Sequence, residues 1–314
     1  MLPLFVQFAI LLISIAVLVK SANYFTDSAE KIGLYFGIPS FIIGITIVSV
    51  GTSLPELFTS IEAVMNNNSQ IVIGDVVGSN IANILLVLGL SFVISKNLQL
   101  TYDITKVDIP MLAASAFFLF ICSINMQFTF LDGILSILAL FIYILYALLS
   151  EKNEFIKLKD KKTYTKISIK VPLMLIISAV AIDFSSKYAV LSIINISKLL
   201  NIGTEIIAAS VVAIGTSLPE LSVSISAARK GNIEISVGNI VGSNIFNTFG
   251  VMGIASLFGT LTITKDMLYM GIPVMIFATL MFIFSIQKKT ITRWEGWMFI
   301  VFYLLFLAKL FNLD

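Results

Sequence analysis

Ten apolar stretches, each of roughly 20 residues, constrain the fold of this 314-residue chain more than any other feature. A helix of about 20 mostly apolar residues is long enough to cross the hydrocarbon core of a bilayer. Backbone groups in lipid must be hydrogen-bonded within the protein, and a helix achieves this within a single segment. The sequence therefore predicts an all-α polytopic membrane protein with ten transmembrane helices. The stretches begin near residues 2, 38, 72, 107, 130, 169, 202, 236, 267 and 294.

The composition excludes several other classes of protein. Charged residues make up 12% of the chain and the mean hydropathy is +1.01, whereas soluble domains carry about 25% charged residues. Soluble, disordered and nucleic-acid-binding proteins are therefore excluded. There is no histidine and only one cysteine, Cys122, so His-ligated metals, Ser-His and Cys-His nucleophiles and intrachain disulfides are excluded as well. A metal site in this chain must use oxygen ligands, which suit hard cations such as Na⁺, Ca²⁺ and Mg²⁺.

The distribution of basic residues predicts the orientation in the membrane. Residues 151–170 form a long polar loop with seven Lys and three acidic residues. If this loop faces the cytoplasm, that side holds fifteen Lys and Arg in its connections and the other side holds three. Cytoplasmic loops carry such an excess of positive charge. We therefore expect a multi-pass protein of the cell membrane, with a cytoplasmic central loop and both termini outside.

An internal repeat indicates how the ten spans are organised. Residues 38–90 align with residues 202–254 without a gap, and 25 of the 53 positions are identical. The identities cluster in GTSLPEL, at 51–57 and 215–221, and in VGSNI-x-N, which ends at Asn83 and Asn247. Five spans separate the two copies, so they have opposite orientations. An inverted repeat is typical of secondary transporters that bind substrate near the midplane, although a duplication kept only for packing is the alternative. The expected division is 1–150, a basic loop over 151–170, and 171–314.

A polar stripe runs along the second span and its counterpart, the seventh. Pro55 lacks an N–H and clashes with the carbonyl group of Gly51, and Pro219 repeats this in the second copy. Helices 2 and 7 are therefore expected to be kinked at the core. The polar residues are spaced three or four apart, which places them on one helix face. The stripe is Ser49, Thr52, Ser53, Glu56 and Ser60 in the first copy, and Ala213, Thr216, Ser217, Glu220 and Ser224 in the second.

Glu56 and Glu220 are the main candidates for function. A carboxylate at the centre of a bilayer costs about 2.5 kcal/mol or more, and a protonated Glu bonded to a neighbouring helix is the alternative explanation. Two facing carboxylates repel unless one is protonated or a cation lies between them. One divalent ion or two monovalent ions would balance their charge, so Ca²⁺ and Na⁺ would compete. By contrast, Glu62 lies near a helix end and is expected to be a surface residue.

The second block adds further oxygen ligands. Ser79 and Asn83 are four residues apart and share a helix face, and Ser243 and Asn247 repeat the pattern. Asp75, matched by Asn239, is expected to be an access or interfacial charge more often than a ligand. Glycines in this block are expected to allow close helix approach; they are Gly74, Gly78, Gly238 and Gly242.

In these blocks the chain resembles the sodium/calcium exchanger family of the cation/calcium antiporter superfamily, in its prokaryotic type without a large regulatory domain. The resemblance covers the whole chain and implies a secondary antiporter that exchanges Na⁺ for Ca²⁺ by alternating access. The calcium ligands that it implies are Glu56, Glu220 and the carbonyl groups of Thr52 and Thr216. The sodium ligands that it implies are Ser49, Ser53, Ser79, Ala213, Ser217 and Ser243. The pair of residues at the centre of the family's binding site corresponds to Asn83 and Asn247. Both are amides here, which argues against potassium coupling.

Three alternatives remain open. A proton/calcium or potassium-dependent antiporter would keep the fold, a passive cation channel would lack coupling, and a membrane-embedded enzyme would use the carboxylates for acid–base chemistry. We expect no enzyme activity, because no nucleophile or cofactor motif accompanies the two glutamates. The expected partners are the lipid bilayer and the transported ions Ca²⁺ and Na⁺, without an organic cofactor or nucleic acid, and a monomer is the expected state.

The predicted topology can be tested by labelling. Single cysteines placed at residue 160 and at the C-terminus should react with a membrane-impermeant reagent from opposite sides of intact cells and inverted vesicles. The positive-inside distribution is the physical reason. Labelling of both positions from the same side would contradict the ten-span count.

Overall fold

The computed structural model describes residues 3–95, 99–149, 167–199, 216–287 and 291–310. Most of them are helical. Six helices are long and apolar enough to cross a membrane: Leu4–Phe36, Ser40–Met65, Gln70–Ile94, Phe130–Ala147, Lys170–Ile196 and Met267–Ile286. Shorter or less apolar helices stand in the places of the other four predicted spans.

The first half of the chain contains five of the predicted spans. They are α1 (Leu4–Phe36); α2 (Ser40–Ile43), η1 (Gly44–Val48) and α3 (Ser49–Met65); α4 (Gln70–Ala82), η2 (Asn83–Leu88) and α5 (Gly89–Ile94); α6 (Asp108–Ser123); and α7 (Phe130–Leu149). The segments labelled η are π-helical turns within longer helices, and such turns are frequent at functional sites.

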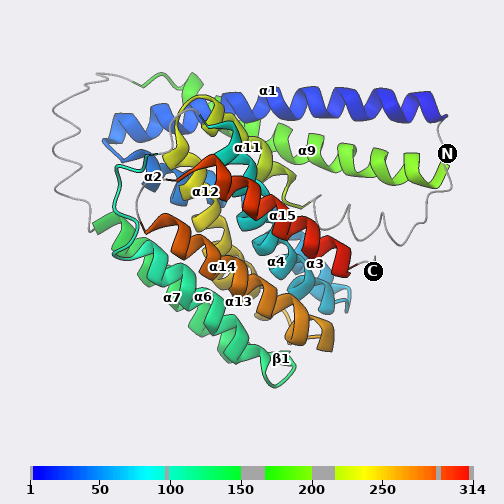
Figure 1. Ribbon diagram of the computed structural model, residues 1–314. Helices are drawn as coiled ribbons and strands as arrows, with labels where there is room; N and C mark the ends of the chain where they lie inside the picture. The colour runs from blue at the N-terminus through cyan, green and yellow to red at the C-terminus, as the bar shows by residue number, and fades with distance from the viewer. Residues whose placement is uncertain (1–2, 96–98, 150–166, 200–215, 288–290, 311–314) are drawn as a thin grey trace.

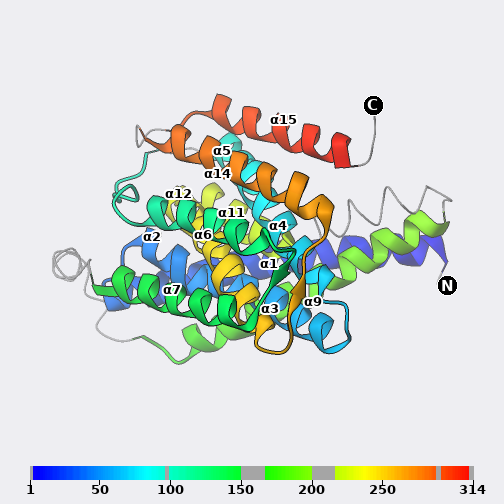
Figure 2. The ribbon, with the colours of Figure 1, turned by 90° about the horizontal axis from the view of Figure 1, so that it is seen from below.

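The second half follows a similar order. It comprises α9 (Lys170–Leu199); α11 (Leu218–Arg229); α12 (Ile233–Phe246), η3 (Asn247–Val251) and α13 (Met252–Ser256); η4 (Met267–Gly271) and α14 (Ile272–Ile286); and α15 (Arg293–Leu310). Two short strands, β1 (Gln127–Phe128) and β2 (Leu261–Thr262), pair antiparallel. Helices α1 and α9 lie side by side along one edge, while α6 and α7 lie on the far side of α12 (Figure 1; Figure 2).

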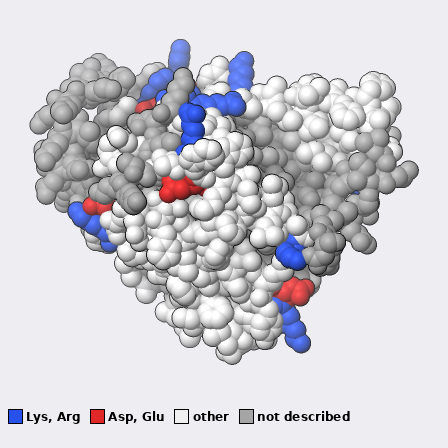
Figure 3. All heavy atoms as spheres, viewed as in Figure 1, with Lys and Arg blue, Asp and Glu red and all other residues white. Residues whose placement is uncertain are grey.

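The outer surface of the molecule is largely apolar, while many polar side chains are buried within it. Large apolar side chains on the outer helices are exposed, including Phe5 (74%), Leu12 (67%) and Phe141 (60%). Most of the face in Figure 3 is likewise uncharged, with few Lys, Arg, Asp or Glu side chains among the described residues. The polar residues of the repeated blocks are instead buried, as Ser53 and Asn247 illustrate. Lipid surroundings explain this pattern, because they favour exposed apolar side chains.

The connections between helices meet in two separate groups. In one group, Ser69 after α3 hydrogen-bonds to Thr262 at 3.3 Å, and the Ile263 amide donates to the Met126 carbonyl group at 3.0 Å. In the other, Asn232 before α12 donates to Glu30 of α1 at 3.2 Å, and Glu234 accepts from the Thr101 amide. The second, fourth and eighth connections thus contact one another, and the seventh contacts the third and the end of α1, as expected for spans that alternate in direction.

Two of the four predicted packing glycines are confirmed. A Cβ atom at Gly238 would overlap the Phe41 carbonyl oxygen, and one at Gly242 would lie 2.6 Å from the Ile45 carbonyl oxygen. Only glycine allows α12 to approach η1 and its neighbours this closely. For Gly74 and Gly78, no atom of the described residues lies within 4 Å of an added Cβ atom, so their part in packing stays a prediction.

The predicted kinks are neither confirmed nor contradicted. Helix α3 continues through Pro55, from Ser49 to Met65. In the second copy, Pro219 lies in the first turn of α11, where a proline is tolerated because the first N–H groups of a helix have no partner within it. The prediction for helix 7 falls partly on residues 200–215, which lie outside the described residues.

The contact between α12 and η1 leads to a stability prediction. Gly242→Ala should lower the free energy of unfolding by about 1–3 kcal/mol, because the new methyl group meets backbone that cannot move aside. Thermal unfolding of the purified protein in detergent measures the change. Gly259→Ala is the control, because its Cβ atom would meet a single side-chain atom, Val64 Cγ1 at 3.0 Å, and no backbone. Equal stability of Gly242→Ala and the unaltered protein would contradict the close packing.

Candidate ion-binding site

Helix α3 carries the predicted polar stripe on its buried face. Ser49, Thr52, Ser53, Glu56 and Ser60 are each at most 2% exposed. The exposed residues of the same helix are mostly apolar, including Leu54 and Phe58. The spacing of three and four residues thus placed these side chains together, as the helical repeat requires.

Helix α11 presents the second glutamate from its first turn. The helix begins at Leu218, after Ser217 as its N-cap, and Glu220 lies in the first turn with its side chain fully buried. The N-terminus of a helix carries partial positive charge, which favours a carboxylate at this place. Ser217 and Ser224 are buried too, whereas Ala213 lies outside the described residues.

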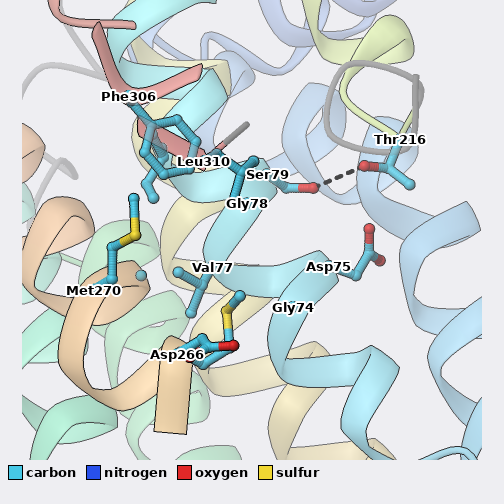
Figure 4. A pocket seen from close by; sticks show the side chains of 13 residues that line it. Gly74, Asp75, Val77, Gly78, Ser79, Thr216, Asp266, Met270, Phe306 and Leu310 are labelled. Atoms are coloured by element: carbon cyan, nitrogen blue, oxygen red, sulfur yellow. Dashed lines mark hydrogen bonds between the residues drawn. The ribbon is translucent and has the colours of Figure 1, made fainter. Parts of the chain in front are cut away.

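Hydrogen bonds join the two repeated blocks across the centre. Ser53 Oγ of α3 donates to Glu220 Oε1 of α11 at 2.9 Å and lies 3.1 Å from Ser243 Oγ of α12. The second block of the first copy also contacts the first block of the second copy: the hydroxyl groups of Ser79 (α4) and Thr216 lie 3.0 Å apart (Figure 4). Residues from both copies therefore form one site, although they lie more than 130 positions apart in the sequence.

Several buried oxygen atoms in this site have no hydrogen-bond partner among the described residues. A buried acceptor without a partner costs about 1–3 kcal/mol, and more when it is charged. These atoms are therefore candidates for contacts with a bound ligand. They are both carboxylate oxygens of Glu56, Oε2 of Glu220, Oδ1 of Asn83 and of Asn247, and Oγ of Ser217.

The two central amides are held in the same way. Asn83 Nδ2 donates to Asn244 Oδ1 at 3.0 Å, and Asn247 Nδ2 donates to Asn80 Oδ1 at 3.3 Å. Both amides are fully buried, and each begins a π-helical segment, η2 or η3. Their nitrogen atoms are occupied, which leaves their oxygen atoms available.

The remaining candidates of the sequence analysis are also placed. Glu62 is exposed, as expected of a surface residue. The Ser49 hydroxyl donates to the Ile45 carbonyl group within its own helix. Asp75 lines a cavity of about 210 Å³ with Ser79 and Thr216, and its carboxylate faces the Thr216 hydroxyl (Figure 4). Asp75 thus lies at the margin of the site, which fits an access charge.

A second cavity, of about 320 Å³, reaches Glu56 from the side of α9. Its lining includes Asp183 and Lys187, which form an ion pair at 3.2 Å. This cavity therefore ends beside the buried Glu56, between α3, α9 and α11.

The sequence analysis assigned no role to three buried amides that shape the site. Asn239 accepts from Thr52 Oγ1 at 3.3 Å and donates to Ser224 Oγ at 2.9 Å. Asn80 and Asn244 hold the two central amides. Both belong to the repeated VGSNI block, so their identity in the two copies was the available signal, but they do not share the helix face of Ser79 and Asn83.

The arrangement suits a hard cation. Carboxylate, amide and hydroxyl oxygens are the ligands that Na⁺ and Ca²⁺ prefer. Among the described residues, no group of three or more His, Cys, Asp and Glu side chains could hold a metal ion, so uncharged oxygens must complete the coordination. Ser53, three residues before Glu56 on α3, hydrogen-bonds to Glu220, so the two carboxylates lie near each other and a cation between them would remove their repulsion.

Comparison with known proteins identifies relatives over nearly the whole chain. A family model described as "Sodium/calcium exchanger protein" matches residues 6–150 and 170–312. "Sodium/calcium exchanger MaX1" from Methanosarcina acetivorans is 34% identical, and the match covers 98% of this chain and 99% of that protein. "Uncharacterized membrane protein MJ0091" from Methanocaldococcus jannaschii is 32% identical over 95% of this chain and 96% of its own. A solved structure of the sodium-calcium exchanger NCX_Mj, soaked with Na⁺ and no Ca²⁺, superposes with a TM-score of 0.84 at 27% identity, over 98% of this chain and 100% of the other.

The unpartnered carboxylates lead to a prediction about ion binding. At a Ca²⁺ concentration of about 100 times Kd, binding should stabilise the purified protein by about 2.7 kcal/mol. Glu56→Gln should lose most of this stabilisation and should unfold in ion-free buffer at or above the temperature of the unaltered protein, because a repelling charge is removed. Thermal unfolding with and without Ca²⁺ measures both effects. Glu62→Gln is the matched control on the same helix, and an undiminished Ca²⁺ effect in Glu56→Gln would place the site elsewhere.

Proposed function

The chain belongs to the sodium/calcium exchanger family, and on that premise we propose that it is a secondary active antiporter that exchanges Na⁺ for Ca²⁺ by alternating access. The observation that carries the proposal is the pair of buried glutamates. Glu56 and Glu220 come from different copies of the repeat, and three of their four carboxylate oxygens have no partner among the described residues. The ion is the substrate, and the site lies between the two carboxylates.

Charge balance supplies the coupling. Two carboxylates carry about −2 charge, which one Ca²⁺ or two Na⁺ would neutralise, while Ca²⁺ and Na⁺ together would overcharge the site. In surroundings of low dielectric constant, an unbalanced charge is costly. The two ions therefore exclude each other, and a site that opens to each side in turn exchanges one for the other. The predicted ligands for these ions are the hydroxyl, amide and carbonyl oxygens named in the sequence analysis.

The proposed architecture is an inverted repeat of two five-helix units, 1–150 and 171–314, with kinked helices 2 and 7 at its core. The contacts of the connections support it. The turn between α3 and α4 lies beside β2, whereas the corresponding turn between α11 and α12 lies beside the end of α1. In this proposal the 151–170 loop faces the cytoplasm and both termini lie outside the cell membrane. The protein acts as a monomer and is not an enzyme.

The central amides favour sodium over the other coupling ions. Asn83 and Asn247 cannot titrate, so they offer no proton-binding group in addition to the two glutamates. A proton/calcium antiporter or a potassium-dependent exchanger is the second candidate within the same fold. A passive channel fits less well, because the ligands come from both copies and enclose the site.

Flux measurements test the proposal. Na⁺-loaded proteoliposomes should take up ⁴⁵Ca²⁺, and the uptake should be independent of K⁺ and of a proton gradient. Glu56→Gln and Glu220→Gln should each abolish uptake, because one remaining carboxylate cannot balance a divalent ion, while both variants fold because a neutral amide is easier to bury.

Glu62→Gln is the control for this experiment and should keep most of the activity, because its side chain is exposed. Uptake that requires K⁺ would favour the potassium-dependent alternative, and uptake driven by protons without Na⁺ would favour the proton antiporter. Near-normal exchange by either Glu56→Gln or Glu220→Gln would contradict the proposed ion site and would indicate that the two glutamates have a structural role.

A further inference from the structure

Two asparagines at the centre of the molecule form a reciprocal set of hydrogen bonds. Asn80 of α4 and Asn244 of α12 are 3% and 2% exposed. Asn80 Nδ2 donates to the Asn244 carbonyl oxygen at 3.4 Å, and Asn244 Nδ2 donates to the Asn80 carbonyl oxygen at 3.2 Å. Asn80 Nδ2 also donates to Thr248 Oγ1 at 3.1 Å. Each side chain is thereby tied to the helix of the other repeat.

The side-chain oxygen atoms of Asn80 and Asn244 each accept a hydrogen bond from another asparagine. Asn244 Oδ1 accepts from Asn83 Nδ2, and Asn80 Oδ1 accepts from Asn247 Nδ2. The amide of each repeat is thus held by an asparagine of the other repeat. We call Asn80 and Asn244 the clasp asparagines.

The orientation of Asn83 and Asn247 decides whether they attract or repel a cation. A carboxamide has an acceptor oxygen at one end and two N–H donors at the other. If the group turned by 180°, the donors would point at the ion. The clasp asparagines occupy the nitrogen ends, and the oxygen ends are buried without a partner among the described residues.

We propose that Asn80 and Asn244 are positioning residues that orient the carboxamides of Asn83 and Asn247, so that both amide oxygens face the transported cation. This inference rests on the proposed cation site between the two repeats. The clasp asparagines contact no ion themselves. They act through the side chains that they hold, and they set the number of neutral oxygens that the site presents.

A double-mutant cycle tests this role. Asn80→Ala, Asn247→Ala and the double variant are purified, and the apparent Kd for Ca²⁺ is measured by calorimetry. A hydrogen bond contributes about 0.5–1.5 kcal/mol, so Asn80→Ala alone should weaken Ca²⁺ binding by about three- to tenfold. In the Asn247→Ala background no amide is left to orient, so Asn80→Ala should change the apparent Kd by less than about twofold.

A purely structural role gives a different result. If Asn80 only stabilised the fold, Asn80→Ala would weaken binding by the same factor in both backgrounds, and that result would overturn the proposal. Ser236→Ala is the control, because it removes the buried Ser236–Ser91 hydrogen bond of 3.0 Å between α12 and α5. It should lower the unfolding temperature and leave the Kd unchanged.

The reciprocal geometry provides a second, independent cycle. Asn244→Ala and Asn83→Ala make the same comparison for the other amide, should Asn80→Ala fail to fold, and additive effects there would also overturn the proposal. Calorimetric Ca²⁺ binding does not depend on Na⁺ exchange. If the unaltered protein does not exchange Na⁺ for Ca²⁺ but the effects of the paired substitutions on Ca²⁺ binding are non-additive, the proposed function is contradicted. If the unaltered protein does exchange the ions but these effects are additive, only the role of the clasp asparagines is contradicted.

Discussion

The burial of two carboxylates beside each other is the constraint on which the rest of this structure depends. Glu56 and Glu220 are at most 2% exposed, and most of their oxygen atoms lack a partner among the described residues. Two ionised carboxylates in this arrangement are unfavourable unless one is protonated or a cation balances them, because charges interact strongly where water is excluded. A bound cation would remove this repulsion, and the proposed exchange of one ion for the other would keep the two charges balanced.

The packing of the surrounding helices brings the two glutamates and the other polar side chains together inside the protein. Polar side chains occupy the interior, and the outer helices present apolar side chains such as Phe5 and Phe141. Glycine at 238 and 242 lets α12 lie directly against η1 and its neighbours, which brings Ser243 within 3.1 Å of Ser53. The close packing of the two repeated blocks and the ion site are thus one structural feature, because a wider separation would break the contacts that position the ligands.

Much of the candidate site was predictable because helical periodicity is a local property. The spacing of Ser49, Thr52, Ser53 and Glu56 requires a common face, and the structure buries that face. Periodicity could not predict which residues of one repeat meet which residues of the other. Asn80 and Asn244 were overlooked for this reason, since they lie off the face of Ser79 and Asn83 and their role depends on a neighbour 161 to 168 positions away.

The sequence by itself determined the membrane class, the expected spans, the repeated blocks and the two glutamates as candidates, because apolar length, spacing and residue identity are properties of single segments. Only the tertiary structure decided the pairing of Ser53 with Glu220, the role of Gly238 and Gly242 in close packing, and the orientation of the central amides. Each of these depends on contacts between helices distant in the sequence. In particular, the orientation of Asn83 and Asn247, whose oxygens have no partner among the described residues, depends on hydrogen bonds that their nitrogen atoms donate to the opposite repeat.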